Sequence, residues 1–312
     1  MELLFLQVST ENASYVLLNE ILAALNNKQM VGRIFCDLYK AFDCFNHAVL
    51  LEKIKFYGVS EKFYNLAKSY LDGRCQKVIL SHNNDIESTW EKIKQGVPQE
   101  SILGPTFFLI YINDLPNLAS IGTKILLYVD DTSILVTSPN LENFETKIDK
   151  IFGDINNWFK VNPLMLNYKK THYLQFNMKN SWDYDLKLNY QGNYVTSSSN
   201  TKFLVLIIDD SLSWKAHIDQ MLSKLNTACF VIWTIQSIMS PETLRMINLA
   251  YVHSIMSYGI ILGGNQQYSD KIFKIQKRVI RIITNSRMRD SCRELFKKLE
   301  ILPLFSQYIF SI

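Results

Sequence analysis

The stretch KILLYVDDTSILVT, residues 124–137, places two adjacent acids, Asp130 and Asp131, between two strongly apolar runs. The runs 124–129 and 132–137 predict two strands, and the acids between them predict the turn of a β-hairpin. Neighbouring carboxylates repel each other and are costly to bury, so they persist at a surface or where cations neutralise them. Mg²⁺ is suitable because it takes oxygen ligands and commonly combines carboxylates with substrate phosphates. An ordinary turn explains the same pair, since Asp is frequent in turns.

A third acid comes from the run Val31 to Leu38, which is mostly apolar and contains Asp37 near its end. This run predicts a buried strand with a carboxylate at its C-terminal end. Two metal ions about 4 Å apart can share carboxylates in phosphoryl transfer, so Asp37 is the candidate for the third ligand. Asp43 is a competitor for that role, and Asp37 has the alternative of capping the next helix.

Residues 95–105, QGVPQESILGP, form a loop punctuated by Gly and Pro that opens a helix expected at 101–115. Such a loop can present backbone N–H groups and the positive end of a helix dipole to a phosphate. An ordinary capped loop explains the same composition.

The remaining periodicity predicts an α+β chain that becomes wholly helical near residue 212. Trp158, Trp214 and Trp233 lie at helical spacing and are interpreted as packing residues. The other expected elements are helices at 46–57, 61–71, 141–159, 214–237, 241–258, 268–283 and 290–299, hairpins at 74–94 and around 191–193, and strands at 173–176 and 203–208.

Composition excludes several classes of protein. The 312 residues are 48% hydrophobic, yet no uncharged apolar run approaches the ~20 residues of a membrane helix. The N-terminus lacks the basic start of a signal peptide, and the five cysteines form no CxxC pair. We therefore expect an intracellular protein, not a secreted or membrane one. Metallohydrolase histidine spacings, a P-loop and a GxSxG elbow are missing from the sequence.

Charge is concentrated near the C-terminus. The segment from Lys271 to Lys298 contains ten Lys or Arg and two acids. Its net charge is therefore +8, whereas the whole chain carries +4. This segment, the basic tail, suits a surface that follows a phosphate backbone. A solvated amphipathic helix is the alternative.

The order of strand acid, QGVPQ loop and Tyr-x-Asp-Asp hairpin resembles the reverse transcriptases of non-LTR, LINE-type retrotransposons, above all the insect jockey type. Residues 35–43, FCDLYKAFD, with Asn46 and His47 resemble the first palm motif. Residues 95–105 resemble the nucleotide-positioning motif, and 128–131 the catalytic hairpin. Residues 158–176, containing LNYKKT, resemble the fourth motif. Residues 203–218 resemble the primer grip and thumb entry, and 257–259 with 275–281 the region after the polymerase.

By this resemblance each motif has a role. Asp37, Asp130 and Asp131 hold two Mg²⁺ ions, for which Mn²⁺ can substitute. Phe42 is the aromatic gate that excludes a ribose 2′-OH, while Gln99 and Tyr128 contact the incoming nucleotide. Lys170 protonates the leaving pyrophosphate as general acid. A solvent-exposed structural lysine is the alternative for Lys170.

The resemblance also implies an architecture: a right-hand polymerase palm, in which an antiparallel sheet packs on helices, followed by a helical thumb. We expect a remnant of the fingers in 1–30, the palm in 31–212, and the thumb and C-terminal region in 213–312. The implied activity is RNA-directed DNA polymerase, with an RNA template, a DNA primer or target, and deoxynucleoside triphosphates as partners. The oligomeric state is not predicted.

Three departures from the family favour a second hypothesis. Glu100 and Val205 stand where the family has glycine. We expect Glu100 to weaken nucleotide binding, because glycine there permits close approach of the backbone. We expect Val205 to be strained if its φ is positive. Most of the fingers is also expected to be missing. The alternative is a catalytically impaired retroelement remnant that only binds nucleic acid, and a third hypothesis is a structural interaction protein.

Overall fold

The computed structural model describes residues 9–80, 86–98, 100–129, 131–176, 188–190, 192–258, 260 and 269–311. Contacts divide the chain into two compact units. The first contains Glu20–Ser199, and the second contains Val8–Asn19 with Asn200–Ile312. Helix α1 (Thr10–Asn26) contributes residues to both units. The expected α+β class is confirmed.

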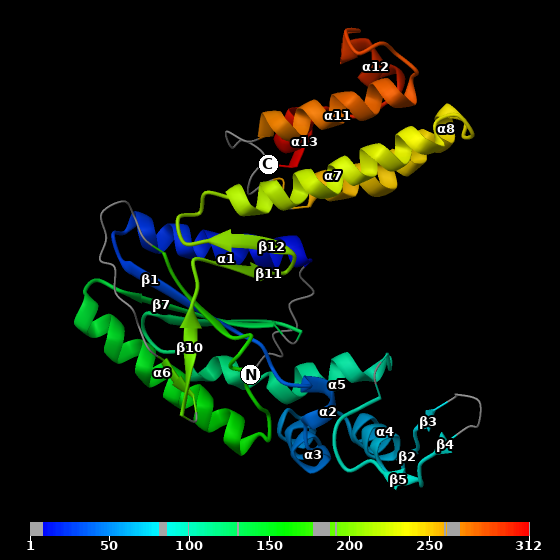
Figure 1. The fold of residues 1–312 in the computed structure, drawn as a ribbon. Helices are drawn as coiled ribbons and strands as arrows, with labels where there is room; N and C mark the ends of the chain where they lie inside the picture. The colour runs from blue at the N-terminus through cyan, green and yellow to red at the C-terminus, as the bar shows by residue number, and fades with distance from the viewer. Residues whose placement is uncertain are drawn as a thin grey trace. The chain divides into compact units, whose positions relative to one another are not determined.

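A six-stranded sheet forms the centre of the first unit in the order β6-β7-β1-β8-β10-β9 (Figure 1). Neighbouring strands are antiparallel except β8 and β10, which run parallel. The sheet therefore differs from the expected antiparallel one at this pair, because β9 reverses the chain before β10 begins. The strands are β1 (Met30–Cys36), β6 (Thr123–Tyr128), β7 (Asp131–Ser138), β8 (His172–Phe176), β9 (Leu188–Tyr190) and β10 (Asn193–Ser197).

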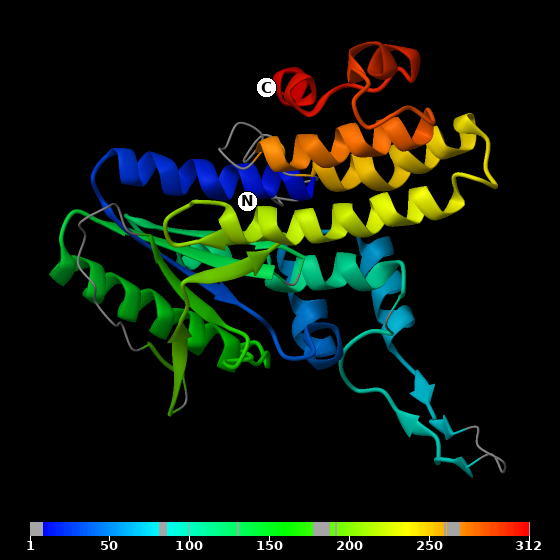
Figure 2. The same cartoon turned by 45° about the horizontal axis from the view of Figure 1, so that its top comes forward.

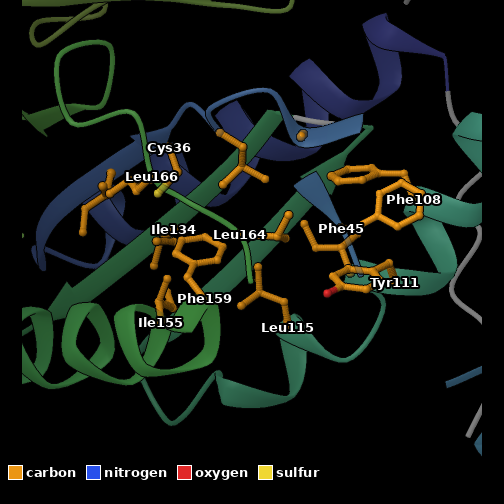
Figure 3. Packing of buried hydrophobic residues seen from close by; sticks show 14 of the residues in the cluster. Cys36, Phe45, Phe108, Tyr111, Leu115, Ile134, Ile155, Phe159, Leu164 and Leu166 are labelled. Atoms are coloured by element: carbon orange, nitrogen blue, oxygen red, sulfur yellow. The ribbon is translucent and has the colours of Figure 1, made fainter. Parts of the chain in front are cut away.

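One face of this sheet carries the core of the first unit. Side chains alternate along strands, so Ile34 of β1 and Ile134 of β7 point to the same buried face. Figure 3 shows Ile134 beside Ile155 and Phe159 of α6, which buries an apolar stripe along its length. The helices of this unit are α2 (Ala41–Cys44), α3 (His47–Phe56), α4 (Glu61–Leu71), α5 (Leu103–Ile112), the 3₁₀ turn η1 (Leu115–Leu118) and α6 (Leu141–Val161).

Helix starts in this unit follow from capping side chains. Asn46, Ser60 and Asn140 accept hydrogen bonds from backbone N–H groups at the first turns of α3, α4 and α6. These groups have no partner within the helix, so the caps fix where each helix begins.

A two-stranded arm follows α4 (Figure 2). β2 (Cys75–Gln76) pairs with β5 (Glu91–Lys92), and β3 (Ile79–Leu80) pairs with β4 (Ile86–Glu87). The expected hairpin is confirmed, while its turn at 81–85 lies outside the described residues.

Within its described residues, the second unit is helical apart from one hairpin, formed by β11 (Asn200–Phe203) and β12 (Leu206–Asp209). The single strand expected at 203–208 is wrong, because Leu204 and Val205 take positive φ angles and turn the chain back. Helices α7 and α11 lie side by side (Figure 1). The helical elements are α7 (Lys215–Ile235), α8 (Pro241–Ile247), the π-helical turn η2 (Asn248–His253), α9 (Ser254–Ser257), α11 (Ser269–Ile283), α12 (Cys292–Lys298) and α13 (Leu304–Ser311).

The tryptophans do not all pack as expected. Trp214 is buried and Trp158 half-buried, but Trp233 is 59% exposed. Helical spacing alone predicted burial, whereas Trp233 lies on the outward stripe of α7 beside the exposed Phe230.

Candidate active site

The register of β1 against β7 puts two of the predicted acids at the same end of two neighbouring strands. The last paired residues are Cys36 and Thr132. Asp37 follows Cys36 and Asp131 precedes Thr132, so the two acids lie directly next to the last pair of this ladder, at the same end of β1 and β7. Asp43 lies further along the chain, in α2. Of the two candidates for the early acid, Asp37 is therefore the one next to the paired end of β1.

The hairpin expected around the two adjacent acids is confirmed and is formed by β6 and β7. β6 pairs with β7 to the very end, where Tyr128 faces Asp131 across a connection of two residues. Val129 has a φ of 54°, a left-handed conformation that is uncommon for a β-branched residue. Asp130 lies outside the described residues. The turn is therefore tight, and its backbone departs from ordinary strand geometry.

Asp37 is also hydrogen-bonded to the segment that contains Lys170. The Asn167 amide Nδ2 donates to Asp37 Oδ2 at 3.0 Å, and the Asn167 backbone N–H donates to the Asp37 carbonyl at 2.8 Å. The Asp37 backbone N–H in turn donates to Thr171 Oγ1 at 3.2 Å. α2 has no side-chain cap. The Asp37 carboxylate thus meets Asn167 rather than the next helix.

Lys170 lies within the turn that makes these bonds. Its backbone N–H donates to the Asn167 carbonyl at 3.1 Å, and its side chain is exposed. The sequence alone suggested Lys170, but it missed Asn167 and Thr171. The motif LNYKKT contains both residues, and the available signal was their short polar side chains near Lys170.

Phe42 contacts Phe108 through its ring and Val97 through its backbone carbonyl. Its ring lies 5.0 Å from the ring of Phe108 on α5, measured between centroids. Its carbonyl accepts from the Val97 N–H at 2.8 Å. The loop that begins at Gln95 is therefore attached directly to α2.

Gly96 allows this attachment. Its φ is +71°, and a Cβ at this position would lie 2.6 Å from the backbone of Asp43. The Gly96 carbonyl contacts His47 Nε2 at 2.6 Å, and its N–H donates to Phe45. Only glycine meets both demands. Gln99, two residues after Val97, lies outside the described residues.

A large open cavity adjoins the loop on the side of α2, with a volume of about 1140 Å³. Its charged lining residues are the basic Lys40, Arg74, Lys92 and Lys94 and the acidic Asp43 and Glu91. Basic side chains outnumber acids among these, so the cavity favours anionic groups.

Both positions where glycine is expected have left-handed backbones. The φ of Glu100 is 61° and that of Val205 is 75°. The expectation of a strained backbone is confirmed at Val205, because a β-branched side chain is disfavoured at positive φ. Glu100 adds a carboxylate beside the loop that holds Gly96.

Cys36, the residue before Asp37, is buried. Burial raises the pKa of the Cys36 thiol to about 12, so the group stays protonated at neutral pH. Its side chain lies with Leu166 in the core (Figure 3). The carboxylate oxygens of Asp37 and Asp131 are donors of the kind that suits a hard cation. Among the described residues no three His, Cys, Asp or Glu form a metal cluster.

Comparisons with known proteins give one consistent result. A family model described as "Reverse transcriptase (RNA-dependent DNA polymerase)" matches residues 7–208. The "Probable RNA-directed DNA polymerase from transposon BS" of Drosophila melanogaster is 26% identical over 89% of the chain and 31% of its own length. The "RNA-directed DNA polymerase from mobile element jockey" of Drosophila funebris is 28% identical over 71% of the chain and 24% of its own length. The chain thus spans about a third or less of these relatives.

A solved telomerase from Candida albicans, in complex with a fragment of telomeric RNA, shares the fold with a TM-score of 0.52. It is 10% identical, and the match covers 95% of this chain and 55% of the telomerase chain. Within the part of the chain that the structure describes, every helix is too short or too polar to cross a membrane.

Proposed function

The chain belongs to the reverse transcriptase family, and from this premise we propose that it is the polymerase portion of a non-LTR retrotransposon enzyme that copies RNA into DNA. The observation that supports the proposal is the pairing of Cys36 with Thr132, which ends the β1–β7 ladder immediately before Asp37 and immediately after Asp131. Carboxylates on neighbouring strands can share divalent cations, whose charge offsets their repulsion.

We propose Asp37, Asp130 and Asp131 as the residues that hold these cations, two Mg²⁺ ions for which Mn²⁺ can substitute. When bound, such ions supply Lewis-acid stabilisation of the charge that develops in phosphoryl transfer. The oxygen donors fit a hard cation, while Cys36 stays protonated in the core.

The other residues bind and orient substrates in this proposal. Phe42 limits space beside the sugar, and its contact with Phe108 fixes its ring. Tyr128 and Gln99 contact the incoming deoxynucleoside triphosphate. Lys170 carries the proton at Nζ that the leaving pyrophosphate takes up, which suits its exposed side chain. The RNA template and the DNA primer or target are the remaining partners.

The domain assignment and location are also part of the proposal. The palm extends from 31 to 212, after a fingers remnant in 1–30, and the thumb and C-terminal region occupy 213–312. The C-terminal part of the second compact unit begins at Asn200, because the hairpin 200–209 packs with the helices that follow it. An intracellular site, nuclear or cytoplasmic, is supported by the five free cysteines, since reducing compartments keep thiols unpaired.

Primer extension on an RNA template with Mg²⁺ or Mn²⁺ tests the activity. We expect extension by the chain and none by Asp131→Asn or Asp37→Asn, because each loses a cation ligand. Asp149→Asn, an equal charge change at an exposed position of α6, is the matched control and should extend as the parent does. Extension by Asp131→Asn at the parental rate would refute the assignment.

Glu100→Gly belongs in the same assay. Glycine accepts the φ of 61° and removes a carboxylate from the loop, so nucleotide affinity should rise. Equal affinity of the two chains would contradict this expectation. If no variant extends a primer but nucleic acid is bound, the impaired remnant is the better description.

A further inference from the structure

The backbone of Asp37 is joined to the segment 165–171 on both sides. Tyr39 N–H donates to the Met165 carbonyl at 2.8 Å, and Leu38 pairs with Leu166 in an isolated antiparallel bridge. Asn167 N–H donates to the Asp37 carbonyl at 2.8 Å. The segment thus continues the sheet beside β1 and fixes the main chain of Asp37.

Asn167 also fixes the side chain. Its Nδ2 donates to Asp37 Oδ2 at 3.0 Å, and within the described residues Oδ2 is the one Asp37 carboxylate oxygen with an assigned partner. A carboxylate at a strand end otherwise rotates about two side-chain torsions. The amide adds no charge, so it orients the carboxylate without neutralising it. Such outer donors commonly decide how well a ligand holds a metal.

The same asparagine closes the turn around Lys170. The backbone N–H groups of Lys170 and Thr171 both donate to the Asn167 carbonyl, at 3.1 and 2.9 Å. Thr171, which is fully buried, accepts from the Asp37 N–H through its hydroxyl. Lys170 therefore lies between two residues that are bonded to Asp37.

We propose that Asn167 is a positioning residue, which aims the Asp37 carboxylate for cation binding and anchors the Lys170 turn to the same acid. The inference rests on the proposed function, because that function makes Asp37 a ligand. It adds a residue that touches neither substrate nor metal and acts through Asp37.

Mn²⁺ binding, measured by electron paramagnetic resonance on the whole chain, tests this without requiring synthesis. Asn167→Ala keeps the backbone bonds and removes the amide donor, so Mn²⁺ affinity should fall roughly 10- to 100-fold. Asp37→Asn should lose the site. Asn143→Ala, at an exposed position of α6, is the matched control and should bind as the parent does.

A second pair of variants protects the test against misfolding. Thr171→Val removes the acceptor for the Asp37 N–H and should weaken Mn²⁺ binding, whereas Thr171→Ser keeps the hydroxyl and should retain it. In primer extension, Asn167→Ala should raise the Mn²⁺ concentration needed for half-maximal rate more than it lowers the rate at saturating Mn²⁺.

The outcomes separate this inference from the polymerase proposal. If the parent does not extend primers but Asn167→Ala binds Mn²⁺ more weakly than the parent, the positioning role is supported and the polymerase activity is not. Parental Mn²⁺ affinity in both Asn167→Ala and Thr171→Val overturns the positioning role. A parent that binds no Mn²⁺ at millimolar concentration overturns both.

Discussion

Arg33 is fully buried in the central strand β1, although its guanidinium has few partners. Nη2 donates to Ser133 Oγ at 3.0 Å, while Nε and Nη1 find no hydrogen-bond partner among the described residues. Burial lowers the pKa of Arg33 to about 9, against an opposing attraction from Glu20. The folded chain therefore holds a cation at a desolvation cost that few contacts offset.

Replacing Arg33 by Met should stabilise the fold. An apolar side chain of similar volume removes the buried charge, and the free energy of unfolding should rise by about 1 to 4 kcal/mol. Urea denaturation measures the change. Arg245→Met, which removes a partly exposed arginine paired with Glu300, should change it by less than about 1 kcal/mol.

The pH dependence gives an independent check on Arg33. Its folded pKa lies below that of the unfolded chain, so the unfolded state binds the proton more tightly. Its penalty is complete below about pH 9 and is relieved as pH rises above that value toward the higher pKa of the unfolded chain. A loss of stability in Arg33→Met at pH 7 would contradict this account.

At the scale of elements, the hairpin of β11 and β12 depends on a turn that its sequence does not favour. Leu204 and Val205 both have positive φ, and Val205 is 46% exposed. The Tyr258 hydroxyl donates to the Leu204 carbonyl, and His217 Nδ1 accepts from the Ile207 N–H at 3.4 Å. Side chains of the following helices thus hold a turn that costs about 1–2 kcal/mol at each left-handed residue.

Val205→Gly should therefore stabilise the second unit by about 1 kcal/mol, since relief of the left-handed strain exceeds the entropy cost of glycine. Chemical denaturation followed by the fluorescence of Trp214 measures it. Val231→Gly is the matched control, because Val231 is 40% exposed but lies in α7. There the substitution should destabilise by about 1 kcal/mol. Two variants that change stability in the same direction would refute the strain argument.

At the scale of the whole molecule, charge is divided unevenly along the chain. The basic tail carries +8, so the remaining residues together carry −4. On α11, Lys274 and Arg278 are exposed four residues apart, while Ile272, Val279 and Ile283 face the interior. The amphipathic pattern of this helix leaves its basic side chains available to a polyanion.

Lys274→Gln with Arg278→Gln should weaken nucleic-acid binding and reduce its salt dependence. Each lost phosphate contact lowers the slope of log affinity against log salt by roughly 0.7 to 0.9. Titrations at several salt concentrations measure the slope. Lys62→Gln with Lys68→Gln, exposed lysines of α4, makes the same charge change and should leave the slope near the parental value. If both double variants have the same slope, α11 is only a solvated amphipathic helix and its basic side chains do not contact phosphates.

Local patterns determined most of the elements and part of the site. Apolar runs and helical periodicity predicted β1, β6, β7, α3, α4 and α6 close to their observed bounds, because these patterns act over a few residues. Local patterns did not predict α1 or α13, and they predicted one strand where Leu204 and Val205 make a turn.

The sequence by itself determined that the chain carries Asp37, Asp131 and Lys170 in the order of a known polymerase. Only the tertiary structure decided which segments lie together: the ladder that ends at Cys36 and Thr132, next to Asp37 and Asp131, and the hydrogen bond to Asp37 from Asn167, which is 130 residues away in the chain. The physical reason is that strand register and hydrogen-bond partners are fixed by packing of the whole sheet.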